Sequence, residues 1–89
     1  MTPRQEQLDP LAPQREAAMF YGLFLRGHSA EALRRDINLP KKLMDKLMRR
    51  HQHELPMRKK LEHAYRYRKQ VLAIFDELVT RRQVQERVH

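Results

Sequence analysis

Apolar residues return at steps of three and four along most of the chain after residue 13, the spacing that places side chains on one side of an α-helix. The pattern predicts a first helix that begins at Pro13 or Gln14, because proline suits an opening turn, and ends before Gly27. We expect its apolar stripe, the most aromatic in the chain, to belong to the core. The stripe consists of Ala17, Phe20, Tyr21, Phe24 and Leu25.

A second, shorter helix is predicted to follow, capped by the Ser29 hydroxyl and extending to about Ile37. Its inward side chains are expected to be Ala30, Leu33 and Ile37. Asn38 tolerates a left-handed backbone, and Leu39 is expected to point back to the core. Pro40 has the φ angle that favours the first position of a helix, so a third helix should start there directly.

The third helix is predicted to run from Pro40 to about His51. Its periodicity predicts that Leu43, Met44, Leu47 and Met48 are buried. The opposite side carries Lys42, Asp45, Lys46 and Arg49.

A polar connector from His51 to Pro56 leads to the longest predicted helix, from Met57 to Arg82. At the usual rise per residue this helix would be ~39 Å long, longer than the three-helix unit that precedes it. Part of it is therefore expected to pair with another subunit in a homodimer. Val71 and Ile74 widen its apolar stripe, and the Arg68 stem bridges a gap in it. The stripe itself comprises Leu61, Ala64, Tyr65, Arg68, Leu72, Phe75, Leu78 and Val79.

Composition agrees with an all-α fold, a small helical domain with a long C-terminal helix. The chain has only 2 glycines, few β-branched residues and no alternating apolar run that predicts a strand. We expect a flexible leader over residues 1–12, a single helical domain over 13–82 and a frayed tail over 83–89.

The absence of cysteine excludes disulfides and thiolate zinc sites. The polar, proline-containing start does not look like a secretory signal, and no apolar run reaches the ~18 residues that a membrane span needs. These features favour a cytoplasmic protein.

The formal net charge of +8 is concentrated in the middle of the sequence. Residues 34–69 hold 13 basic and four acidic side chains, a local net charge of +9, whereas residues 1–33 are nearly neutral. Such a cationic segment attracts polyanions and gains free energy from the release of their counterions. Nucleic acid is therefore the expected partner, and a solvated helix face without a ligand is the alternative.

Residues 25–50, and in particular the stretch from Leu25 to Met48, resemble the helix-turn-helix of bacterial DNA-binding proteins. Seven residues carry this resemblance, at the positions where the family places its cap, its buried side chains and the start of its recognition helix: Ser29, Leu33, Ile37, Leu39, Pro40, Met44 and Leu47. Asn38 replaces the usual turn glycine, and Arg34 replaces a small residue, which leaves open a different angle between the helices. A helical hairpin packed within the domain is the alternative interpretation.

The resemblance implies a DNA-binding protein, such as a transcriptional regulator, whose third helix enters the major groove. Because three of the four cations on the exposed face of the third helix, Lys41, Lys42, Lys46 and Arg49, are lysines, limited sequence discrimination is expected. The candidate nucleic-acid-binding residues are Arg34, Arg35, Lys41, Lys42, Lys46, Arg49, Arg50, Arg58, Lys59 and Lys60.

Two tyrosines lie among the basic residues near the start of the long helix and could stack on bases. The simpler interpretation places Tyr65 in the core stripe and Tyr67 at its polar margin. RNA binding by the same cations is a further alternative. Another is a protein-interaction module that uses the amphipathic C-terminal helix and a surface of Met44, Met48 and Met57. Adsorption to a membrane surface is the least favoured hypothesis.

Catalytic or metal chemistry is not expected. His51 and His53 are two residues apart, which directs helical side chains away from a common ion. The sequence contains no thiol and no glycine-rich phosphate loop, so we expect a non-enzyme without a cofactor.

Overall fold

The computed structural model describes the backbone of residues 9–88 and the side chains of residues 9–85, and all regular structure in this part is helical. The helices are α2 (Ala12–Leu25), α3 (Ala30–Ile37), α4 (Lys41–Arg50) and α5 (Leu55–Val88). The predicted all-α domain with a long C-terminal helix is confirmed. Residues 1–8 of the predicted leader lie outside the described residues, and Ala12, which was assigned to the leader, is the first residue of α2.

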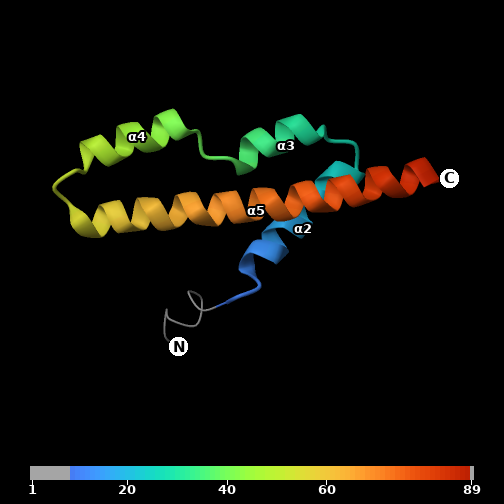
Figure 1. Cartoon of the computed structure of the whole chain (residues 1–89), viewed down its shortest axis with the longest axis horizontal. Coiled ribbons are helices and arrows are strands. Elements are labelled where there is room, and N and C mark those ends of the chain that lie inside the picture. Colours follow the sequence, from blue (N-terminus) through green and yellow to red (C-terminus); the bar gives the residue numbers. More distant parts are fainter. Residues whose placement is uncertain (1–8, 89) are drawn as a thin grey trace.

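The long helix α5 organises the molecule, because each of the other helices packs on it. Figure 1 shows α3 and α4 following one another along the same side of α5, while α2 crosses α5 in its second half. The α3 and α4 helices do not pack against each other. The unit that resembles a helix-turn-helix is therefore laid out along α5 and does not form a compact pair of helices.

The backbone between α3 and α4 explains this layout. Asn38 has φ −76° and ψ 137°, and Pro40 has φ −60° and ψ 137°, so both are extended. The left-handed conformation that Asn38 was expected to tolerate is not adopted, since no non-glycine residue in residues 9–88 has a positive φ. Proline disfavours the helical region for the residue before it, which promotes an extended linker.

Two of the predicted helix boundaries are confirmed in detail. The Ser29 hydroxyl accepts a hydrogen bond from the Ala32 amide at 3.0 Å, so it caps α3. Gly27 has φ 111°, a conformation that side chains disfavour, and it follows the end of α2. Pro40 is the N-cap of α4, and Lys41 is the first helical residue.

The α5 helix is longer than predicted at both ends. It begins at Leu55 and continues to Val88, through the segment expected to fray. No glycine or proline follows Pro56, so nothing in the backbone chemistry interrupts the helix. With 34 residues the helix is about 51 Å long.

The hydrophobic core lies where α2 and α3 meet the second half of α5. Its fully buried members are Ala17, Leu33, Ile37, Val71, Phe75 and Val79. Aromatic residues of α2 pack against one side of this core. The centres of the Phe24 and Phe75 rings are 6.5 Å apart, and the rings meet edge to face. Three side chains predicted to be inside are exposed, namely Leu25, Leu43 and Ala64. Leu43 is in α4 and Ala64 is in α5. Among the described helices α4 packs on α5 alone, and two single helices cannot cover all of their apolar faces.

Candidate nucleic-acid interface

The outer face of α4 carries a line of basic side chains. Lys42, Lys46 and Arg49 follow one another at steps of four and three residues, so they project from the same side of the helix. Met44, the one fully buried residue of α4, is two positions from each lysine and hence about 200° around the helix. The three cations therefore point away from α5.

These three side chains are exposed, and none has a carboxylate within ion-pair distance among the described residues. Arg50 is likewise exposed at the end of the same helix. We name Lys42, Lys46, Arg49 and Arg50 the α4 basic face. Cations without partners in the protein remain free to contact anions from solvent.

The other predicted residues of α3 and α4 are arranged less uniformly. Lys41 contacts Asp45 one turn further on, with 3.1 Å between Nζ and Oδ2. Arg34 donates from Nε to Oδ1 of Asp76 in α5 at 2.5 Å, so it ties α3 to α5. Arg35 is exposed on α3 and has no ion-pair partner within residues 9–85, and it lies two positions from the buried Leu33 and Ile37. Arg35 can supplement the α4 basic face, whereas Arg34 is committed to a contact inside the protein.

The cations at the start of α5 do not join the α4 basic face. Arg58, Glu62 and Tyr65 are partly covered, whereas Lys59 and Lys60 are exposed. Lys60 is two positions from both Arg58 and Glu62, which places it on the opposite side of the helix. The Arg58 side chain is also partly removed from solvent. Its Nε is buried and has no hydrogen-bond partner among the described residues. The ten predicted residues therefore do not form one surface.

The two tyrosines have the reverse of their expected roles. Tyr67 packs against the core and donates a hydrogen bond from its hydroxyl to Oε1 of Glu16 at 3.2 Å. Burial, and then the negative charge of Glu16, raises the pKa of the Tyr67 hydroxyl. Tyr65 is partly covered, and the Lys69 ammonium lies 5.2 Å from the centre of its ring. Both rings are engaged within the protein, so base stacking gains no support.

The proposed methionine surface is not formed. Met44 is buried on the inner side of α4, Met48 is half-buried, and Met57 is 36% exposed. The histidines of the connector are used locally, since His51 Nδ1 lies 3.2 Å from Oε2 of Glu54. Within residues 9–85 no group of three histidine, cysteine, aspartate or glutamate side chains is placed to hold a metal ion.

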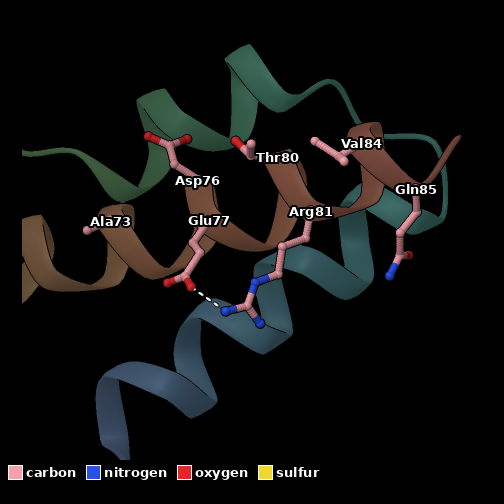
Figure 2. Close-up of a pocket in the computed structure, with 7 residues that line it drawn as sticks. All are labelled: Ala73, Asp76, Glu77, Thr80, Arg81, Val84 and Gln85. Carbon is pink, nitrogen blue, oxygen red and sulfur yellow. Dashed lines mark hydrogen bonds and ion pairs between the residues drawn. The ribbon is translucent and has the colours of Figure 1, made fainter. Parts of the chain in front are cut away.

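A shallow depression lies on the second half of α5, and Figure 2 shows its lining residues. All of them come from α5, and two of them, Glu77 and Arg81, form an ion pair at 2.5 Å. A third, Asp76, is the partner of Arg34. A single helix does not enclose a ligand on several sides, so the depression lacks the form of a small-molecule site.

Comparison with known proteins gives no match: no protein-family model, no curated protein and no solved structure resembles this chain at a significant level. In the part of the chain that the structure describes, no helix combines the length and the hydrophobicity that crossing a membrane requires.

Several contacts that define the site join residues far apart in the sequence and were not predicted. Arg34 pairs with Asp76, and Lys69 donates a hydrogen bond to the Asn38 side chain at 3.1 Å. Arg68 was expected only to pack its stem, yet its guanidinium lies 3.5 Å from the Glu16 carboxylate. The available signal was the presence of isolated carboxylates on otherwise apolar helix faces, which need a cationic partner when they are partly covered.

Proposed function

We propose that this protein binds nucleic acid through the α4 basic face, with double-stranded DNA as its ligand. The observation that carries the proposal is that Lys42, Lys46 and Arg49 form an exposed line on α4, directed away from the rest of the molecule and free of carboxylate partners in the described residues. Arg50 and Arg35 extend the positive charge on either side of this line.

The dimensions of α4 suit a duplex. A helix with its side chains is about 10–12 Å in diameter, and the major groove of B-DNA is about 12 Å wide. Lys42 and Arg49 are seven residues apart, which corresponds to about 10 Å along the helix axis. Because α4 lies at the outside of the molecule and contacts only α5, its outer face can approach a groove without interference from α3.

The contacts proposed are mainly with phosphates. Lysine acts as a mobile point charge, and Arg49 and Arg50 are the only side chains of the α4 basic face with the bidentate geometry that reads guanine. The extended linker also removes the support that a packed helix-turn-helix gives to a recognition helix. We therefore propose affinity for the duplex with little preference for sequence.

The test is an electrophoretic mobility shift on a short duplex DNA, a duplex RNA and a single strand, at several salt concentrations. If the three cations of the line each neutralise one phosphate, the logarithm of the association constant should fall with the logarithm of salt with a slope of about −2.7 for duplex DNA. The double variant Lys42→Glu with Lys46→Glu should bind at least about tenfold more weakly, and its slope should shrink to about −0.9, because only Arg49 of the line remains.

The matched control is Lys59→Glu with Lys60→Glu, which changes the net charge equally at two exposed residues of α5 outside the α4 basic face. This control should retain most of the affinity. Equal loss in both double variants would show that net charge alone attracts the ligand, and absence of binding to all three nucleic acids at low salt would refute the proposal. Preferential binding of duplex RNA would show that RNA, and not DNA, is the ligand.

A further inference from the structure

The α2 helix is apolar on two opposite sides, although α5 and α3 cover only one of them. Residues 17–25 read Ala-Ala-Met-Phe-Tyr-Gly-Leu-Phe-Leu and contain no charged side chain. Ala17 is fully buried, and Phe20, Tyr21 and Phe24 pack against the core. A helix that is apolar all round is normally covered all round.

The second side of α2 is uncovered in the single chain. Leu11 just before the helix is 52% exposed, Met19 is 57% exposed and Leu25 is 49% exposed. Ala18 is also exposed, and a Cβ added to Gly22 would meet no atom within 4 Å. We name Leu11, Ala18, Met19, Gly22 and Leu25 the α2 outer face.

We infer that the α2 outer face is covered by a second copy of this chain, in an antiparallel α2 to α2 contact. The first argument is charge. Each chain carries a net charge of +8, so two copies repel each other wherever their basic segments meet. The α2 outer face lies in the nearly neutral part of the chain, residues 1–33. Two arginines lie on the same side of α2, Arg15, which is paired with Asp9 at 2.9 Å, and the exposed Arg26. Two like-charged chains therefore repel each other less here than along their basic segments.

The second argument is the symmetry of the spacing. Leu11 and Leu25 each lie seven residues, about two turns, from Ala18. A two-fold axis that passes near Ala18 would place Leu11 of one chain against Leu25 of the other, and Leu25 of the first against Leu11 of the second. This reciprocity is what a two-fold interface requires. The small side chain at the centre lets the two helices approach closely.

The third argument is the comparison with the other candidate for self-association, the free end of α5. Among the described side chains beyond Val79, only Val84 is a large apolar residue, and it is surrounded by threonine, arginine and glutamine. The length of the C-terminal helix predicted a homodimer, but α2 exposes more apolar surface for such a contact than the end of α5 does. A helix of 14 residues is about 21 Å long, so the interface is small and a dissociation constant of about 1–100 μM is expected.

The experiment is sedimentation equilibrium of the full chain over protein concentrations that span this range. The unchanged chain should pass from monomer to dimer. Ala18→Arg places two like charges against each other at the centre of the contact and should weaken the dimer at least about tenfold. The matched control Val84→Arg adds the same charge at an exposed site of α5 and should leave the dimer as it is. Because Ala18 is exposed, circular dichroism should show unchanged helicity in both variants.

A second readout uses the absence of cysteine from the sequence. Ala18→Cys should give a covalent dimer on mild oxidation or with a short thiol crosslinker, whereas Val84→Cys should not. Covalent dimers of Val84→Cys alone would place the contact on α5 and overturn the inference. A chain that stays monomeric at all concentrations would also overturn it.

This inference does not rest on the proposed function, and salt separates the two. Added salt screens the repulsion between two positively charged chains, so dimerisation should strengthen or stay constant as salt rises. Binding of nucleic acid should weaken over the same range. Loss of one behaviour without the other would identify which proposal has failed.

Discussion

At the scale of single residues, Phe75 is the largest fully buried side chain and holds the core together. It lies between its neighbours Val71 and Val79 on the same face of α5, and its ring meets Phe24 of α2. Few other side chains are fully buried, so little packing is available to compensate for its loss.

We predict that Phe75→Ala lowers the free energy of unfolding by about 3–5 kcal/mol, because it removes buried apolar surface and leaves a cavity. Urea denaturation followed by circular dichroism at low protein concentration measures this. Leu43→Ala serves as the control, and since Leu43 is 43% exposed its effect should stay below about 1 kcal/mol. A similar loss in both variants would contradict the assignment of the core.

Tyr67 links α5 to α2 in a way that depends on pH. The pKa of its hydroxyl is raised in the folded chain, first by burial and then by Glu16. Its contribution to stability is therefore complete below the unfolded value of about 10 and is lost as the pH rises through the higher folded value. Stability of the unchanged chain should fall more steeply above pH of about 10 than stability of Tyr67→Phe, as measured by urea denaturation across this range. Parallel pH profiles would show that Tyr67 titrates alike in both states.

At the scale of elements, the short α3 helix depends on its cap. Ser29 satisfies the Ala32 amide, which would otherwise lack an acceptor in the first turn. With 8 residues, α3 is too short to be stable without such contacts and its packing on α5.

We predict that Ser29→Ala destabilises the protein by about 1 kcal/mol, whereas Ser29→Asp retains most of the stability, because aspartate caps equally well. Thermal and urea unfolding of the two variants give the comparison. Equal destabilisation by both replacements would mean that the hydroxyl is not the source of the effect.

Periodicity was enough to predict the four helices, the cap at Ser29 and the break at Gly27, because these depend on residues close in the sequence. The burial of Leu43 was predicted wrongly, since an apolar stripe specifies which side of a helix turns inward and not how many neighbours will cover it. The extended backbone at Asn38 was missed for a related reason. Asparagine permits several conformations, and in the structure its side chain accepts a hydrogen bond from Lys69, which lies 31 residues away and is not paired with it by any local pattern.

The candidate site was predicted in part. The α4 basic face follows from spacing within one helix, so Lys42, Lys46 and Arg49 could be assigned together. Arg34, Lys59 and Lys60 could not be separated from that set by sequence, because their directions depend on how α3 and α4 lie against α5. The α2 outer face was overlooked because a stripe predicted to be core accounted for most of the apolar residues in that helix.

At the scale of the whole molecule, the single chain is elongated. Its radius of gyration is 15.9 Å, whereas a compact domain of this length has a value of about 12 Å. The principal extents of 55 × 36 × 18 Å reflect the length of α5 and the thin layer of helices on it.

We predict that small-angle X-ray scattering of the monomeric Ala18→Arg variant gives a radius of gyration close to that of the structure and well above the compact value. The unchanged chain at high concentration should scatter with about twice the mass if the α2 outer face joins two copies. A monomer with the radius of a compact sphere would show that α4 or the end of α5 folds back in solution.

The lack of contact between α3 and α4 has a consequence for local opening. The α4 helix is held by α5 alone, whereas α3 packs on both α5 and α2, so α4 can unwind without breaking any contact that keeps α3 in place. Amide protons of α4 should then exchange with deuterium through fluctuations far smaller than global unfolding, while those of α3 and the second half of α5 stay protected. If the phosphates of a nucleic acid bind Lys42, Lys46 and Arg49, exchange should slow in α4 first. Increased protection of the α4 amides would then report binding directly.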